Sequence, residues 1–327
     1  MVARFFKNND KLGFVLLPVA AIAAWSFALI LPGFNTLFVE NSFIFSLFAK
    51  KIPFWLIAAF NLISLITGAY MITFLCIKQE ISDKQNLIPG FIYIVFASVL
   101  NCTSALHPCL IANLFLIASL HRLFSIYREE VSLAAVFDSA FFLGIGGLFY
   151  TPVFAFILIP FISLIILKPF KLREWILVIC GFLLPLLLSL ALLFLFNNPL
   201  ELLQNSILSS FTPAHKFVFG KGSFLIHSIT ALLVFLGLIN SFLRAGNPKI
   251  KTQKIKNILL WCLLFGAAAV FTLNEAPFFF GILLIVPISI FIGDFLGNLK
   301  NSVLREFLTL LLLGAFVCSN LQAAGYL

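Results

Sequence analysis

Residues 134–156 read AAVFDSAFFLGIGGLFYTPVFAF, an apolar run that contains one carboxylic acid, Asp138. A short turn at Tyr150 and Thr151 divides this run between two helices, which we expect at 131–148 and 152–168. Helices of this kind approach the ~20 apolar residues that cross a bilayer. Strands of a membrane barrel would be about 10 residues long and would alternate in polarity. The stretch therefore predicts membrane helices.

The composition of the whole chain agrees with this prediction. Of the 327 residues, 62% are hydrophobic and 10% are charged, whereas roughly a quarter of an average soluble chain is charged. We predict an all-α, polytopic bundle over 1–327, a single integral membrane domain with about eleven spans. The spans are expected at 13–32, 54–77, 87–104, 106–122, 131–148, 152–168, 174–196, 224–243, 257–273, 277–297 and 307–325.

The basic residues indicate how the bundle is oriented. Of the 21 lysines and arginines, all except Lys50, Lys51, Lys216 and Lys221 fall on one side of the predicted bundle. Because such residues are enriched in cytoplasmic loops, we expect the N-terminus inside and the C-terminus outside. The net charge of +9 fits membrane lipids as partners, since cationic loops lie against anionic headgroups. It requires no nucleic acid, and the sequence does not specify protein partners.

Three connections are longer than a simple turn. The outer segments 33–52 and 197–223 are expected to contain short amphipathic helices. The inner segment 244–256, RAGNPKIKTQKIK, is polar and basic. We interpret it as a flexible cytoplasmic loop that joins two sub-blocks, 1–243 and 257–327.

Asp138 is expected near the midplane of the membrane. It follows the inner end of its predicted span by about 10 Å, at 1.5 Å per residue, and an Asp at a helix centre costs ~3 kcal/mol to insert. Asn61 and Asn113 fall at a similar level, so we predict a polar layer of Asn61, Asn113, Asp138 and Ser139. The layer is either a relay or coupling-ion site or an interhelical hydrogen-bond clamp. We expect no Lys, Arg or second acid at that level, which favours the clamp.

A second group of polar residues is expected at the outer face. Its acid, imidazole and ammonium groups would supply a general base and a cationic clamp for a phosphate, although loop charges also serve solubility alone. The candidate residues are Glu40, His107, His215, Lys216, Lys221 and Glu275. The chain lacks a Walker sequence and G-x-S-x-G. Its 4 histidines show no zinc-binding spacing, so we expect no metal and no cofactor.

Residues 122–188, RLFSIYREEVSLAAVFDSAFFLGIGGLFYTPVFAFILIPFISLIILKPFKLREWILVICGFLLPLLL, and residues 5–14, FFKNNDKLGF, carry a resemblance. They are similar to a family of multi-span inner-membrane proteins from Bacteroidota that has no established function. The shared pattern is a cytoplasmic Arg-rich turn, a span that contains Asp138, and the turn Lys168-Pro169-Phe170. The resemblance implies a multi-pass protein of the bacterial inner (cytoplasmic) membrane.

A more distant resemblance is to the GT-C class of membrane glycosyltransferases and to related polysaccharide polymerases. There too, a glycine-rich span leads through a short outer turn into a proline-containing span and a cytoplasmic Lys/Arg turn. The resemblance implies a polyprenyl-phosphate-linked substrate and a catalytic acid in the first outer loop. By position, Glu40 would be that acid, and Lys216 or Lys221 would contact the phosphate.

Three hypotheses for the function follow. The first is a GT-C-like transferase that acts on a lipid-linked substrate at the outer face, with Glu40 as its base. The second is a transporter or flippase that uses the polar layer around Asp138. The third is a non-enzymatic membrane scaffold whose basic segment 244–256 docks an acidic protein or a lipid.

Overall fold

A computed structural model gives the structure of the chain. It describes residue 6 and the ranges 11–30, 54–82, 86–99, 109–127, 132–195, 221–243, 250–272 and 277–323. The regular structure of these residues is entirely helical, which confirms the predicted all-α class for the described part. The helices are α2 (Lys11–Ile30), α4 (Phe54–Lys78), α5 (Ile88–Val99), α6 (Cys109–Ser125), α7 (Leu133–Phe149), the 3₁₀ segment η1 (Thr151–Ile157), α8 (Leu158–Leu167), α9 (Leu172–Leu195), α11 (Lys221–Leu243), α12 (Ile250–Thr272), α13 (Pro277–Asn298) and α14 (Ser302–Ala323).

Each of the eleven predicted ranges overlaps a described helix. By length and composition, two of these helices are able to cross a membrane: the part 59–78 of α4 and the part 172–191 of α9. Shorter apolar helices lie in most of the other ranges. The turn expected at Tyr150 and Thr151 is confirmed, because Tyr150 ends α7 with extended backbone and its N–H donates to Gly146 O at 2.9 Å.

One boundary differs from the prediction and bears on the site. Helix α12 begins at Ile250, so the second half of the predicted loop 244–256 is helical. Its three lysines therefore stand on helix faces rather than in a flexible hinge. The two proposed sub-blocks also share one hydrophobic core, since α13 packs against α5 and α11 packs against α13 and α14.

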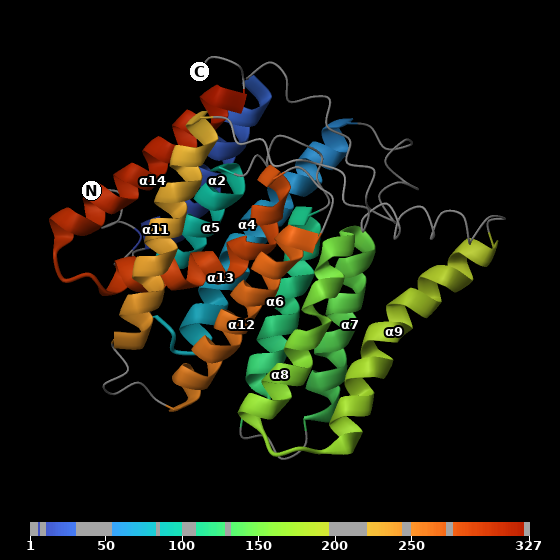
Figure 1. The fold of residues 1–327 in the computed structure, drawn as a ribbon. Helices are drawn as coiled ribbons and strands as arrows, with labels where there is room; N and C mark the ends of the chain where they lie inside the picture. Colours follow the sequence, from blue (N-terminus) through green and yellow to red (C-terminus); the bar gives the residue numbers. More distant parts are fainter. Residues whose placement is uncertain are drawn as a thin grey trace.

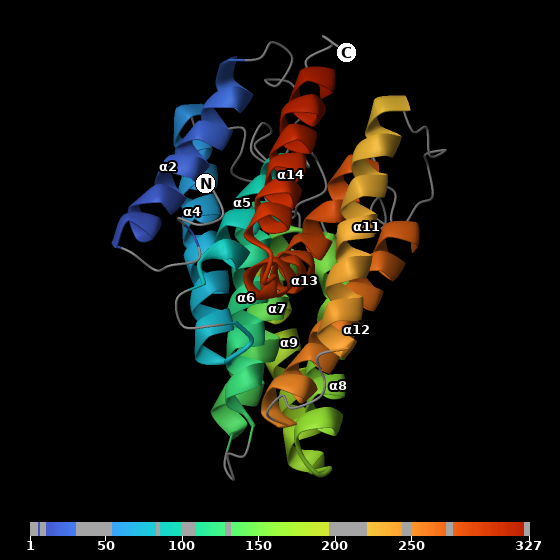
Figure 2. The same cartoon turned by 90° about the vertical axis from the view of Figure 1, so that its left-hand side faces the viewer.

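Helix α5 is the centre of this core. Every residue from Ile88 to Ala97 is buried, and α5 contacts α2, α4, α13 and α14. In Figure 2 it lies behind α14, with α4 on one side and α13 on the other. Proline bends helices because it removes a backbone donor and clashes with the preceding turn. Helix α13 contains Pro287, and in Figure 1 its orange-red second half crosses the direction of the neighbouring helices.

Glycines allow α7 and α9 to lie in direct backbone contact. A Cβ atom on Gly144 would be 2.8 Å from Phe182 O, and one on Gly181 would be 2.6 Å from Phe137 O. Only glycine fits such an approach, as is common between membrane helices. Figure 1 shows α9 leaving the bundle in its second half, beyond this contact; Pro185 lies inside that helix.

Candidate functional site

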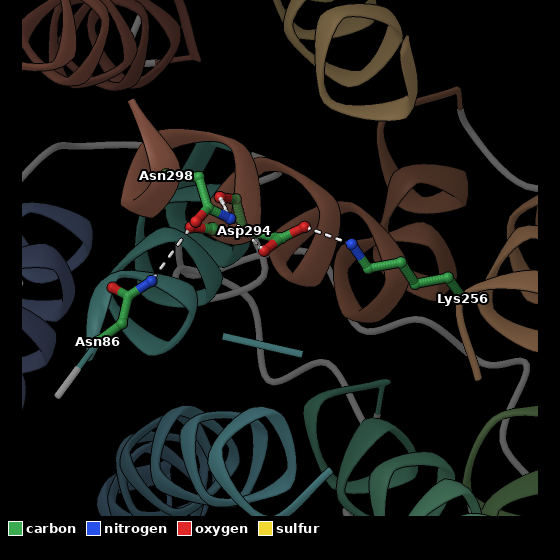
Figure 3. Close-up of polar contacts among 5 residues, drawn as sticks. Asn86, Lys256, Asp294 and Asn298 are labelled. Atoms are coloured by element: carbon green, nitrogen blue, oxygen red, sulfur yellow. Dashed lines mark hydrogen bonds and ion pairs between the residues drawn. The ribbon is translucent and has the colours of Figure 1, made fainter. Parts of the chain in front are cut away.

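The best-formed polar site of the described residues is an ion pair between α12 and α13 (Figure 3). Lys256 Nζ lies 2.7 Å from Asp294 Oδ2, and the two side chains are 19% and 5% exposed. A charge that leaves water costs several kcal/mol unless it is paired and hydrogen-bonded. Each of these residues therefore depends on the other for its place in the core.

The second oxygen of Asp294 is satisfied by its own helix. Asn298 Nδ2 donates to Asp294 Oδ1 at 2.7 Å and to the main-chain O of Asp294 at 2.8 Å. The spacing of four residues brings the two side chains to one face of α13, as helix geometry requires. Both carboxylate oxygens are thus held, and the acid has a fixed orientation toward α12.

Asn86 connects this site to the start of α5. Its Oδ1 accepts from Ile88 N at 3.0 Å and so caps the helix, while its Nδ2 donates to Gly293 O at 3.4 Å. Glycines on both sides of Asp294 make room for this approach: a Cβ on Gly293 would lie 2.7 Å from Pro89 Cα, and one on Gly297 would clash with Asn86. Figure 3 shows Asn86 approaching α13 from the opposite side to Lys256.

Residues of α12 and α13 and the residue that caps α5 therefore meet at the site. Cys76 of α4 is fully buried nearby, within electrostatic reach of Asp294 and Lys256. A buried carboxylate and an ammonium group in contact are able to exchange a proton or to separate around a charged substrate. Within the residues that the structure describes, no three His, Cys, Asp or Glu side chains gather as a metal site.

A second buried ion pair lies where α8 turns into α9. Lys168 Nζ is 3.8 Å from Glu174 Oε1, with side chains 7% and 4% exposed, and it donates to Ser132 Oγ at 2.6 Å. Lys168 is the C-cap of α8, and Ser132 precedes α7. These contacts fasten the start of α7 to the turn between α8 and α9.

Asp138 has a basic partner that the sequence analysis did not expect. Arg122 Nε lies 3.4 Å from Asp138 Oδ2, and the Asp138 side chain is 35% exposed. Arg122 stands in the last turn of α6 and Asp138 in the second turn of α7, so the pair lies near the end of this helix hairpin. The acid also lines a groove of about 520 Å³ between α7 and α9.

Asn113 and Asn61 of the predicted polar layer are buried at other levels, whereas Ser139 is buried directly beside Asp138 on α7. Asn113 precedes Arg122 by nine residues, roughly 13 Å along α6. Asn61 precedes Lys78 by seventeen residues, roughly 25 Å along α4, and Lys78 Nζ contacts His121 of α6 at 3.4 Å. Ser139 donates to Val136 O of its own helix at 2.7 Å. A joint role of the four residues as a relay or a clamp stays a prediction.

Most of the expected outer-face residues lie outside the described part of the chain. Glu40, His107, His215, Lys216 and Glu275 belong to the undescribed ranges. Lys221 is the first residue of α11, and its side chain is also outside the description. The transferase site therefore stays a prediction.

The sequence analysis missed Asp294 and Lys256 for separate reasons. Asp294 is a second acid inside an apolar run, SIFIGDFLGN, and its flanking glycines were a usable signal. It was passed over because it falls near the end of a predicted span. Lys256 was assigned to a loop because lysines lower the hydropathy of its segment. No local pattern indicated that it faces Asp294.

Comparison with known proteins yields one result. The model of a family of unknown function matches residues 16–321 of the chain. No curated protein and no solved structure matches it. The match agrees with the predicted membership of an uncharacterised family and bears on neither the bacterial group nor the resemblance to GT-C enzymes.

Proposed function

The chain belongs to DUF6427, a family of unknown function, and from its structure we propose that it is a multi-pass membrane protein of the transporter or flippase class. Its bundle has about eleven spans in the bacterial inner membrane, with the N-terminus inside and the C-terminus outside. The buried pair of Lys256 and Asp294 is the ionisable centre that substrate or proton movement uses. This pair is the observation that carries the proposal.

Exposed apolar faces support the membrane location. A water-soluble monomer rarely leaves a large contiguous apolar patch on its surface. Helix α9 leaves most of its apolar side chains uncovered, and α2, α11 and α14 each leave several. On α9 the large exposed apolar residues are Leu172, Ile176, Ile179, Leu183, Leu184, Leu187, Leu188 and Phe194.

The helix ends support the proposed orientation. Basic residues gather where α4, α6, α8 and α13 end and where α9, α12 and α14 begin. Antiparallel succession puts these ends on one side of the bundle, and contacts such as Lys78 to His121 join neighbouring ends. Positively charged ends mark the cytoplasmic side.

The position of Asp294 supports a role in transport. Ionisable residues inside membrane bundles are rare, face the interior and mark ion or substrate pathways. Bent or broken helices commonly form such sites, and Asp294 lies on the half of α13 that follows Pro287. The site around Asp294 therefore replaces Asp138 as the centre of the transport hypothesis. No described contact favours the transferase, whose candidate acid is Glu40.

Proteoliposomes that contain a pH-sensitive dye test the proposal. We expect the wild-type protein to move protons when a membrane potential is imposed, and we expect Asp294→Asn and the double variant Lys256→Met/Asp294→Leu to lose this movement. The double variant removes both charges, so a purely structural pair would keep the protein folded and active. Lys251→Gln, on the same helix, is the matched control and should behave like wild type.

Two results would overturn the proposal. The first is that the wild-type protein moves no protons in the liposomes and that deletion of its gene leaves the pools of lipid-linked compounds and solutes in the cell unchanged. The other is a double variant that matches wild type in the liposomes. Glu40→Ala in the deletion strain separates the transferase hypothesis, since it should remove activity only if Glu40 is the base.

A further inference from the structure

The groove between α7 and α9 combines apolar walls with charge. It has a volume of about 520 Å³, and Leu133 and Phe137 of α7 face Ile176 and Leu177 of α9 across it. The charged groups that line it are Arg173 and Asp138. It therefore joins an apolar surface to a guanidinium group.

The charge of this groove is positive overall. Arg122 lies 3.4 Å from Asp138 and balances its charge, while Arg173 forms no ion pair with any residue that the structure describes. Lys171, two residues before Arg173, is exposed. A planar guanidinium binds a phosphate through paired hydrogen bonds, so the groove complements a group with one negative charge.

Aromatic residues place Arg173 at the depth of lipid headgroups. The ring of Trp175 lies 5.2 Å from that of Phe161 and 5.1 Å from that of Phe170, centroid to centroid. Tryptophan is enriched where a membrane meets water. The side chain two residues away from Trp175 therefore stands in the same interfacial layer.

The groove ends where α7 and α9 touch, and an apolar stripe begins beside it. A Cβ on Gly181 would lie 2.6 Å from Phe137 O, so nothing passes between the two backbones at that level. Along the outer face of α9, however, Ile176, Ile179, Leu183 and Leu187 are exposed. Their spacing of three or four residues forms a continuous stripe along the helix.

We infer that this groove binds a phospholipid with an anionic headgroup. The phosphate contacts Arg173, and one acyl chain lies along the exposed stripe of α9 that starts at Ile176. The inference rests on the proposed membrane location but not on a role of Asp294 in transport. It assigns to the chain a lipid site that is separate from the pair of Lys256 and Asp294.

Native mass spectrometry of the full chain in detergent tests this site, with phosphatidylglycerol and phosphatidylcholine as probes. We expect the wild type to bind phosphatidylglycerol more tightly. Arg173→Gln should weaken that binding about five-fold, because one basic residue near anionic lipid contributes about that factor. Ala134→Trp, which fills the groove, should weaken the binding of both lipids. Lys300→Gln removes an exposed lysine elsewhere at the basic end and should change nothing.

Equal affinity of the wild type for the two lipids would overturn the inference. So would an Arg173→Gln protein that binds phosphatidylglycerol as tightly as Lys300→Gln does. Melting curves confirm that each variant is folded before the lipids are added. Fractionation of the cells that produce the protein distinguishes a failure of the lipid site from a failure of the proposed function, because protein found outside the membrane fraction contradicts the membrane location itself.

Discussion

Asp138 and Asp294 are both single acids within apolar stretches, yet their surroundings differ. Asp138 is partly exposed beside Arg122, whereas Asp294 is buried against Lys256. Their local sequences do not distinguish them, because a hydropathy pattern gives the depth of a residue but not the side chain that faces it. The sequence analysis predicted that Asp138 would lie inside the bundle and missed Asp294, because the pairing of Asp294 with Lys256 depends on a contact across 38 residues of chain.

Gly181 shows how closely one residue can limit helix packing. In Gly181→Ala the new Cβ would lie 2.6 Å from Phe137 O, so α7 and α9 must separate. Overpacking of this kind costs about 1–3 kcal/mol. We expect a lower melting temperature in detergent, measured by the loss of helical circular dichroism.

Gly314 supplies the matched control for this substitution. A Cβ on Gly314 meets no other atom within 4 Å. Gly314→Ala should therefore leave stability unchanged or raise it by roughly 0.5–1 kcal/mol through helix propensity. Equal melting temperatures of the two variants would contradict the close contact between α7 and α9.

The places of the helices along the chain were predicted better than their exact starts, since each predicted range overlaps a described helix while α12 and α14 begin earlier than expected. The stretch 134–156 divides at Tyr150 as expected, because the hydropathy on either side is uniform and the turn residues are distinctive. Helix α12 was predicted too short, because its first two turns are rich in lysine and their mean hydropathy is therefore too low to indicate a membrane span. The central position of α5 was not predicted either. A helix that is apolar on every side gives no indication of which of its faces contacts which neighbouring helix.

Two asparagine caps allow the docking of α5 to be tested. Asn86 caps α5 and also donates to Gly293 O of α13, whereas Asn301 caps α14 at an exposed position. Asn86→Ala loses both the cap and a buried contact, so it should cost about 2–3 kcal/mol. Asn301→Ala loses only a cap and should cost about 1 kcal/mol. Thermal unfolding of both variants measures the difference, and equal losses would argue against the docking of α5 on α13.

At the scale of the whole molecule, basic residues gather at one set of helix ends. This pattern was visible in the sequence because most of the connections between the predicted helices are short, so their lysines and arginines fall close to the helix ends. The arrangement of the helices in space was not visible, since α13 and α5 are brought together by packing rather than by sequence neighbourhood. The order of the helices along the chain therefore followed from the sequence, whereas the contacts between helices that are distant in sequence did not.

Reporter fusions test the orientation of the whole chain. Alkaline phosphatase fused after Leu327 should be active, because the C-terminus is expected outside, and green fluorescent protein at the same place should be dark. After Lys78, where α4 ends, the two reporters should give the opposite result. If one reporter were active at both positions, the two positions would lie on the same side of the membrane. That result would contradict an odd number of spans between them and therefore the proposed orientation.

The hydrogen bond from Asn86 to Gly293 spans 207 residues, and this separation has a consequence for biosynthesis. A ribosome adds about 5–20 residues per second, so α5 waits roughly 10–40 s for the helix that covers it. During that time Asn86 and α5 lack their partner, because the glycines that make room for them belong to α13. A chain that stops translation before α13 should consequently leave this side of α5 uncovered and be degraded as incomplete.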